Sequence, residues 1–281
     1  MKVRIISSAI GLFLLIATVL ISKETFAFAV FILSVIATRE FYDAVSKAGY
    51  NPVKSIGYIS CSIILLLGFK DQIGSIISLP DEFLSGQVVL LLVLFIPLIL
   101  SLPMTVFFHE KYNIADIAMT ITGIFYTVFM FMFLYLTREL NDGTYYIWII
   151  FIGAWATDTF AYFGGLTFGK NKLTPVISPN KTVEGAITGV LGCVVSLVLY
   201  GFLAKENLGH IPLFHFVIMG FLSGIISQIG DLTASAIKRF SKIKDYGNII
   251  PGHGGVLDRF DSVLLISPII FFYLYFILQL H

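Results

Sequence analysis

The sequence predicts a polytopic α-helical membrane protein, and three observations carry that prediction. Apolar residues make up 57% of the 281 residues, whereas charged residues make up only 12%, about half the share that is usual in soluble domains. The apolar residues come in unbroken runs of about 20, the length that crosses a bilayer as a helix. A soluble domain of this size could not bury so much apolar surface, and a transmembrane β-barrel would show alternating runs of about 10 residues.

We predict nine membrane-spanning helices, because backbone polar groups in lipid must find their hydrogen bonds within the segment. They cover Ile5–Ile21, Thr25–Val45, Ser55–Ile77, Gln87–Phe108, Ile114–Leu136, Tyr145–Leu166, Val183–Ala204, Pro212–Gly230 and Ser262–Leu280. Lys70 and Asp71 interrupt the third run. The apolar core of the first run exceeds the 7–15 residues of a signal peptide, so we expect it to be a span.

The distribution of basic residues predicts the orientation of these spans. With nine spans, most of the 18 Lys and Arg residues fall on the face that holds the N-terminus and the loops after the even-numbered spans. The opposite face receives only Lys23, Lys70, Arg138 and Lys205. Because basic loops stay in the cytoplasm, we expect a cytoplasmic N-terminus. The net charge of +1 gives no indication of a nucleic-acid partner.

The character of the loops suggests a division of the chain into three parts. Residues 1–84 hold helices 1–3, residues 85–138 hold helices 4 and 5, and residues 139–281 hold helices 6–9. The loops after spans six and eight are long and rich in Gly, Pro, Asn, Lys and Asp, the kind of loop that usually carries a site. We therefore expect the catalytic part to be 139–281.

The segment that follows span eight carries the densest set of polar side chains. Continued as a helix, it places Asp231, Ser235 and Lys238 on one face. Further on, Asp258 and Asp261 are three residues apart, so on a starting helix their carboxylates face the same side. If spans eight and nine pack together, Asp231 could reach them. Such oxygen donors suit Mg²⁺, which proteins hold with one or two carboxylates and substrate phosphates.

The same segment contains groups suited to binding phosphate. Glycines around His253, among them Gly254 and Gly255, allow backbone N–H groups to approach an anion closely. Nearby lysines and arginines would neutralise phosphate oxygens. The simpler interpretation is a solvated basic loop whose aspartates cap helices or pair with Lys and Arg.

A second polar segment runs from span six to span seven. Asp158 lies inside an apolar run, where a carboxylate either marks a site or pairs with a neighbouring helix. The glycine-rich stretch before Asn171 is not a phosphate-binding Walker loop, because Asn171 replaces the required Ser or Thr and a membrane helix precedes it. The stretch Ser178-Pro179-Asn180-Lys181-Thr182 leads into span seven, and Ser or Thr as the N-cap and Pro at the first helical position are ordinary signals of a helix start. That helix start, with Lys181 and Thr182, could also bind an anion.

Both segments resemble the phosphatidate cytidylyltransferase (CDP-diacylglycerol synthase) family over roughly residues 150–265. The first match is Asp158-x2-Ala161-Tyr162-x2-Gly165-x3-Gly169-Lys170-x2-Leu173, followed by Ser178-Pro179-x-Lys181-Thr182-x-Glu184-Gly185. The second is Ser235-x-Ile237-Lys238-Arg239-x4-Lys244-Asp245-x-Gly247-x2-Ile250-Pro251-x-His253-Gly254-Gly255-Val256-x-Asp258-Arg259-Phe260-Asp261. The first 140 residues carry no motif that we can interpret.

The resemblance implies transfer of CMP from CTP to phosphatidate, with CDP-diacylglycerol and pyrophosphate as products in phospholipid synthesis. It implies an inner-membrane enzyme with a cytoplasmic site, Mg²⁺ or a pair of cations, and a homodimer, for which helices 4 and 5 could supply the contact. Asp231 and Asp258 would be metal ligands, with Asp261 a third by its spacing. The residues expected to hold phosphates or line the substrate pocket are Ser178, Lys181, Thr182, Ser235, Lys238, Arg239, Lys244, His253, Gly254, Gly255 and Arg259; Asp158 is a further acidic candidate within the membrane.

Two other functions are compatible with a basic, polytopic chain. A cation-coupled transporter would use Asp158 and Asp231 as coupling carboxylates, although its site should then lie near the middle of the bilayer. A CTP-dependent polyprenol kinase would share the nucleotide and the membrane but would transfer the γ-phosphate.

Overall fold

The computed structural model describes residues 2–76 and 86–280, and those residues are mostly helical. The chain divides into two compact units. The first comprises Met1–Leu136 and Phe240–Arg259, and the second comprises Thr137–Arg239 and Phe260–His281. Each unit is described by itself below.

The first unit is built mainly from α2, α3, α5 and the broken helix α7–η2–α8. Its elements are α1 (Lys2–Ile21), α2 (Lys23–Lys47), α3 (Lys54–Gly68), α4 (Lys70–Ile76), α5 (Gly86–Ser101), α6 (Met104–Phe107), α7 (Ile114–Ile124), the π-helix η2 (Phe125–Phe129) and α8 (Met130–Glu139), which ends just past the unit boundary. Within it α2 packs against α3 and α7. A Cβ at either Gly57 or Gly123 would overlap the buried ring of Tyr42, so small residues permit this packing.

Helix starts in this unit follow ordinary capping rules. The Ser22 hydroxyl accepts the N–H of Thr25 at the start of α2. Asn113 and Asp116 form a capping box at the start of α7. Asp116 is buried and also accepts the N–H of Asn51, so its carboxylate joins the α2–α3 connection to α7.

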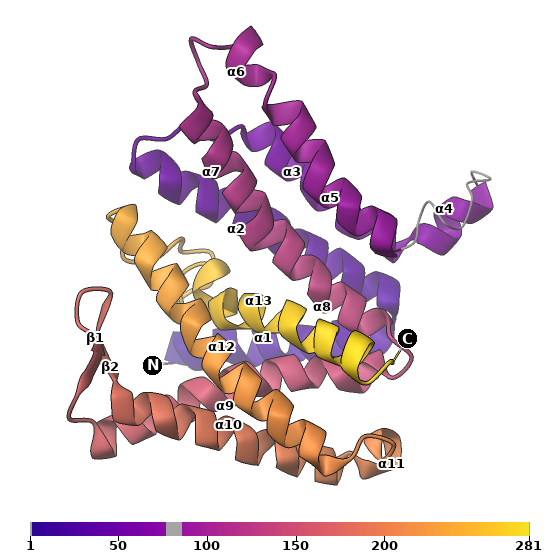
Figure 1. Ribbon diagram of the computed structural model, residues 1–281, viewed down its shortest axis with the longest axis vertical. Helices are drawn as coiled ribbons and strands as arrows, with labels where there is room; N and C mark the ends of the chain where they lie inside the picture. Colours follow the sequence, from indigo (N-terminus) through magenta and orange to yellow (C-terminus); the bar gives the residue numbers. More distant parts are fainter. Residues whose placement is uncertain (1, 77–85, 281) are drawn as a thin grey trace. The chain divides into compact units, whose positions relative to one another are not determined.

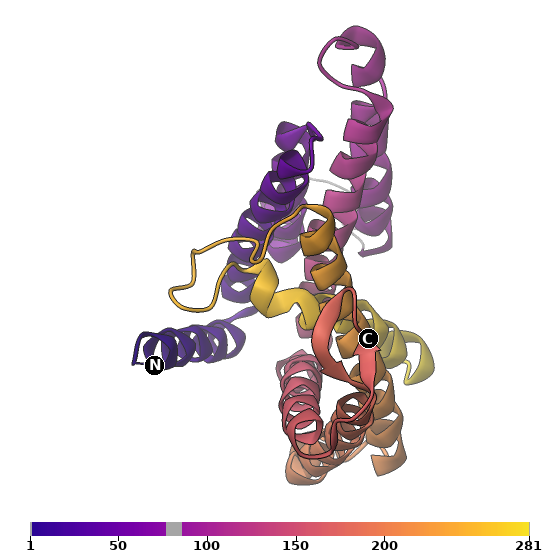
Figure 2. The ribbon, with the colours of Figure 1, turned by 90° about the vertical axis from the view of Figure 1, so that its left-hand side faces the viewer.

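The second unit consists of long helices and one small hairpin. Its elements are α9 (Gly143–Phe168), β1 (Lys172–Thr174), β2 (Ser178–Thr182), α10 (Val183–Leu203), α11 (Lys205–Leu208), α12 (Leu213–Phe240), α13 (Leu257–Phe272) and the π-helix η3 (Tyr273–Ile277); the last residue of α12 and the first three of α13 belong to the first unit. In Figure 1, α9 and α10 run side by side, with the hairpin at one end of the pair. Figure 2 shows the hairpin projecting beyond these two helices.

Glycines set the helix spacing in the second unit. Gly185 of α10 lies so close to α9 that an added Cβ would stand 2.8 Å from the carbonyl oxygen of Ala161 and 3.1 Å from the Cα of Gly165. Gly230 of α12 is similarly tight, because its Cβ would stand 2.6 Å from the carbonyl oxygen of Asp261 on α13. A backbone atom cannot swing away as a side chain can, so these two contacts fix where α10 and α12 lie.

The helices support a multi-pass membrane protein. Six of the described helices are long and apolar enough to cross a membrane: Lys23–Lys47, Ile114–Glu139, Gly143–Phe168, Val183–Leu203, Leu213–Phe240 and Leu257–Ile277. Three shorter apolar helices are Ile5–Ile21, Lys54–Gly68 and Leu91–Phe107. The predicted third span, Ser55–Ile77, divides at Phe69 into α3 and α4, beside the charged pair that interrupts the run.

The predicted start of span seven at Val183 is confirmed, because α10 begins there. Ser178 and Pro179 lie outside that helix, because Ser178–Thr182 forms β2, paired antiparallel with β1. The N-cap is Thr182, whose hydroxyl accepts the N–H of Gly185 at 3.1 Å. The hairpin is an addition to the expected all-α architecture, and it closes the polar connection between two membrane helices.

Candidate active site

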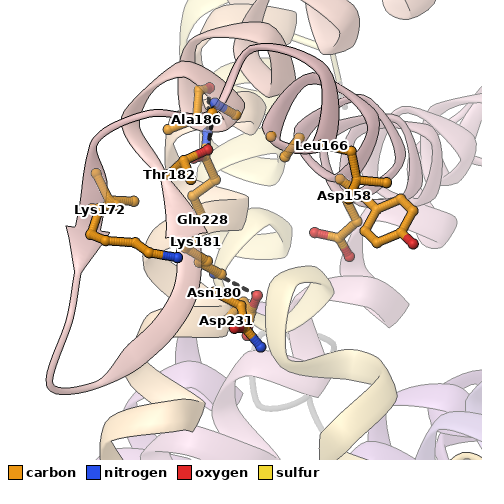
Figure 3. A pocket seen from close by; sticks show the side chains of 15 residues that line it. Asp158, Leu166, Lys172, Asn180, Lys181, Thr182, Ala186, Gln228 and Asp231 are labelled. Carbon is orange, nitrogen blue, oxygen red and sulfur yellow. Dashed lines mark hydrogen bonds and ion pairs between the residues drawn. The ribbon is translucent and has the colours of Figure 1, made fainter.

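A cavity of about 590 Å³ opens in the second unit among α9, the hairpin, α10 and α12, and its size is typical of small-molecule sites. Polar side chains from four elements line it, namely Asp158, Lys172, Asn180, Lys181, Thr182, Gln228 and Asp231. Figure 3 shows Lys172 and Lys181 on the hairpin side and Asp158 on the facing helix. Lys181, Thr182, Asp158 and Asp231, all predicted site residues, are thus brought to one cavity.

Lys181 and Asp231 form an ion pair across this cavity. The Nζ of Lys181, on β2, lies 2.5 Å from Oδ2 of Asp231, on α12, and both side chains are partly exposed. Ser235, one turn further along α12, donates its hydroxyl to Oδ1 of Asp231 at 3.5 Å. The predicted continuation of span eight as a helix with these residues on one face is therefore confirmed.

Asp261, near the start of α13, is a buried carboxylate that does not line this cavity. Its exposed fraction is 9%, and its own carboxylate accepts the N–H of Ser262 at 2.7 Å. It is repelled by the carboxylates of Asp231 and Asp158 and attracted by Lys238. The backbones of α12 and α13 approach closely at Gly230, the residue before Asp231. Whether Asp231 also reaches Asp258 stays a prediction.

The polar turn before the hairpin is held by a carboxylate that sequence reasoning left without a role. Glu184, in the first turn of α10, accepts the backbone N–H groups of Lys170 and Asn171 at 3.0 and 3.2 Å. It also accepts the side-chain amide of Asn171 at 2.7 Å. Glu184 thereby ties the end of α9 to the start of α10, on either side of the hairpin that carries Lys172 and Lys181.

Asp258 belongs to the first unit, where it organises the loop between α12 and α13. Its Oδ2 accepts the backbone N–H of Tyr246 at 2.8 Å and that of Gly255 at 3.0 Å. Gly254 adopts φ of +86°, and a Cβ there would stand 2.8 Å from the same oxygen. A glycine is thus required for the loop to fold over Asp258. Because Asp231 lies in the other unit, a metal site shared by the two carboxylates stays a prediction.

Four of the predicted phosphate-binding residues of the loop, Lys244, His253, Gly254 and Arg259, line one hollow of about 630 Å³. It is lined by Lys244, Asp245, Gly247, Asn248, Ile250, Gly252, His253, Gly254 and Arg259. The Nε of Arg259 donates to the carbonyl oxygen of His253 at 2.9 Å, which anchors the guanidinium beside the loop. Both ring nitrogens of His253 are hydrogen-bonded to α1, with Nδ1 2.9 Å from the hydroxyl of Ser7 and Nε2 3.2 Å from that of Ser8.

Three predicted residues have other surroundings. Ser178 pairs with Thr174 in the hairpin and does not line the 590 Å³ cavity. Arg239 donates from Nε to the carbonyl oxygen of Ile177 at 3.3 Å, so it supports the hairpin turn. Gly255 packs against the carboxylate of Glu40, so a Cβ added at position 255 would overlap that carboxylate.

Sequence reasoning missed Glu40 and Gln228 entirely. Glu40 lies in α2 with an exposed fraction of 4% and accepts the backbone N–H groups of Val256 and Leu257. Gln228 lines the cavity and donates to the carbonyl oxygens of Ala186 and Gly224. An acidic residue inside an apolar run is a signal of a site by itself, so Glu40 could have been found in the same way as Asp158.

Comparisons with known proteins extend over nearly the whole chain. A sequence model of the cytidylyltransferase family matches residues 2–277. The phosphatidate cytidylyltransferase of Staphylococcus haemolyticus is 32% identical over 273 residues, which cover 96% of this chain and 97% of that protein. The proteins of the same name from Staphylococcus saprophyticus and Staphylococcus aureus (strain COL) are 34% and 31% identical over 274 and 275 residues, with the same coverage of both chains.

Proposed function

Because this chain belongs to the cytidylyltransferase family, we propose that it is an enzyme that converts CTP and phosphatidate to CDP-diacylglycerol and pyrophosphate. The match to phosphatidate cytidylyltransferases over 96% of the chain is the observation that carries this proposal. A cavity with paired lysine and aspartate side chains at the end of membrane helices fits a reaction between a nucleotide and a lipid phosphate.

This reaction requires the protein to position the two substrates and to neutralise the charge on their phosphate oxygens. A phosphate oxygen of phosphatidate attacks the α-phosphorus of CTP in line, the bond to the β-phosphate oxygen breaks, and pyrophosphate leaves with its electron pair. Such transfers need little covalent help from the protein. Lys172 and Lys181 in the cavity, and Lys238, Arg239, Lys244 and Arg259 along α12 and its loop, would hold the phosphate oxygens of the two substrates.

Two carboxylates of the second unit support a proposal for a cation, although no group of three or more His, Cys, Asp or Glu side chains among the described residues is already placed to hold one. Asp231 and Asp261 are close enough to repel each other, with Asp158 also within electrostatic range, and a divalent ion relieves such repulsion. We propose that Asp231, Asp258 and Asp261 hold Mg²⁺, or a pair of cations at one site. When bound, the ion would neutralise charge on the reacting phosphates. Lys181 would then exchange its bond with Asp231 for contacts with substrate phosphate.

The proposed topology follows from the substrates. Nine spans with the N-terminus in the cytoplasm would place both long polar loops on the side where CTP is dissolved and where phosphatidate presents its phosphate. We therefore propose that the chain lies in the inner membrane with its active site facing the cytoplasm. By family analogy we also propose a homodimer, with residues 85–138 as its contact.

Labelled CTP distinguishes this function from a lipid kinase or a transporter. Purified protein in detergent receives phosphatidate, a polyprenol, Mg²⁺ and CTP labelled at either the α- or the γ-phosphate. The expected result is α-label in the lipid product and γ-label in pyrophosphate. Transfer of γ-label to a polyprenol with release of CDP would instead support a kinase. If both labels stay in CTP, the result would favour the transporter.

A further inference from the structure

Glu40 is a buried carboxylate that does no chemistry in the proposed reaction, yet it grips the segment that presents Asp258. Its Oε1 accepts the N–H of Val256 at 3.0 Å, and its Oε2 accepts the N–H of Leu257 at 2.9 Å. These are the two residues immediately before Asp258, at the start of α13. A carboxylate from α2 thus caps α13 from outside its own helix, at the end where the helix dipole favours negative charge.

Glu40 and Asp258 accept hydrogen bonds from three consecutive backbone N–H groups of one loop. Asp258 takes the N–H of Gly255, and Glu40 takes those of the next two residues. Removal of either carboxylate therefore leaves buried donors without partners and frees the backbone to which the other is attached. The direction in which Asp258 points consequently depends on Glu40.

The packing around Glu40 is an independent sign that its position is fixed. A Cβ at Gly247 would stand 2.5 Å from Oε1 of Glu40, and a Cβ at Gly255 would press on both of its carboxylate oxygens. The loop therefore packs tightly against the carboxylate of Glu40 on two sides, at Gly247 and at Gly255. Burial of an acidic group is costly unless it is fully hydrogen-bonded, and an apolar residue would close this packing at lower cost.

We infer that Glu40 is a positioning residue of the active site, which fixes the loop 246–257 so that Asp258 and Arg259 face the substrates. This inference rests on the proposed function, because Asp258 and Arg259 are assigned to metal and phosphate there. Groups that orient a ligand from behind typically change activity 10- to 100-fold when they are replaced.

The test compares Glu40→Gln and Glu40→Ala with Asp116→Asn. Asp116 is the matched control, because it is also buried in the first unit and also accepts two backbone N–H groups, those of Asn51 and Asn113. Hydrogen exchange of the purified full-length proteins measures loop order. The same preparations give kcat and the Mg²⁺ concentration for half-maximal rate.

We expect exchange at 246–257 to rise in both Glu40 variants and kcat to fall by about 10- to 100-fold in Glu40→Ala. Glu40→Gln keeps one acceptor oxygen and should fall between wild type and Glu40→Ala. Asp116→Asn should raise exchange only near 50–53 and 113–116, with kcat within about twofold of wild type. Glu40 variants with a mobile loop and wild-type kcat would overturn the inference, as would an equal loss of kcat in Asp116→Asn.

A second variant tests the same contact without touching the carboxylate. Gly247→Ala should push Glu40 aside and lower kcat, whereas adding it to Glu40→Ala should cost nothing further. Additive losses would contradict the inference. If the wild-type protein transfers no CMP but hydrogen exchange of the variants follows the expected pattern, the proposed function is wrong. The conclusion that Glu40 fixes the loop 246–257 would still hold.

Discussion

Lys181 and Asp231 illustrate how a substrate can replace a contact within the protein. The two side chains neutralise each other, and both face a cavity large enough for a ligand. Lys181→Ala should reduce turnover by about 10²- to 10³-fold, because a cation aimed at developing phosphate charge is lost. Lys205→Ala, in the short helix α11, is the control and should retain wild-type turnover. The labelled-CTP assay measures both, and equal activity of the two variants would remove Lys181 from the site.

Asp258 has a structural task beside its proposed chemical one, and two substitutions separate them. Asp258→Asn keeps an oxygen that can accept from Tyr246 or Gly255, so we expect a folded protein with turnover reduced at least about 100-fold. Asp258→Ala removes the acceptor and should in addition lower the free energy of unfolding by about 1–3 kcal/mol. Thermal unfolding in detergent and the turnover assay check the two effects. Near-wild-type turnover of Asp258→Asn would contradict the metal assignment.

Among the helix contacts, the one at Gly230 sets how closely α12, which carries Asp231, packs against α13, which carries Asp261. Gly230→Ala should separate α12 from α13, because the new Cβ would stand 2.6 Å from a backbone oxygen. Gly220→Ala is the matched control on the same helix, since its Cβ would stand equally close to the Cα of Val194 on α10. Both should lose about 1–3 kcal/mol of stability, as overpacked sites do. Only Gly230→Ala should also raise the Mg²⁺ concentration for half-maximal turnover; an equal rise in both would show that Gly230 has no specific part.

The helices were easier to predict from sequence than the turns between them. Runs of apolar residues located the six described helices that are long and apolar enough to cross a membrane, and the charged pair Lys70–Asp71 marked the division of the third run. The hairpin escaped prediction because Ser178 and Pro179 are as good at starting a helix as at forming an edge strand. Local propensity could not decide between these, whereas the pairing with Lys172–Thr174, a tertiary contact, did.

The part of the candidate site that could be predicted consists of residues whose type is unusual at their place in the sequence. Asp231, Asp261 and Lys181 stood out because charged residues at the edge of a span are costly and usually functional. Thr182 stood out only through the motif, and its observed task is to cap α10. Glu40 carried the same signal as Asp158, an acidic residue inside a predicted span, but its role could not be predicted. Its partners are backbone amides more than 200 residues away, and amides leave no trace in a sequence pattern. Glu184 was visible in the motif, but its task of holding Lys170 and Asn171 could be read only from the fold.

At the scale of the whole molecule, the charge asymmetry makes a prediction that labelling can check. Cys61 and Cys193 are both buried, so their replacement by Ala gives a background in which introduced cysteines report alone. Val176→Cys, in the highly exposed turn of the hairpin, should react with a membrane-impermeant maleimide only in inside-out vesicles. Asn207→Cys, in α11 at the other end of α10, should react only in intact cells. Because these two sites flank α10, labelling of both from the same side would exclude α10 as a membrane-crossing helix. The reverse labelling pattern would place the CTP-binding face outside the cytoplasm and would contradict the proposed topology.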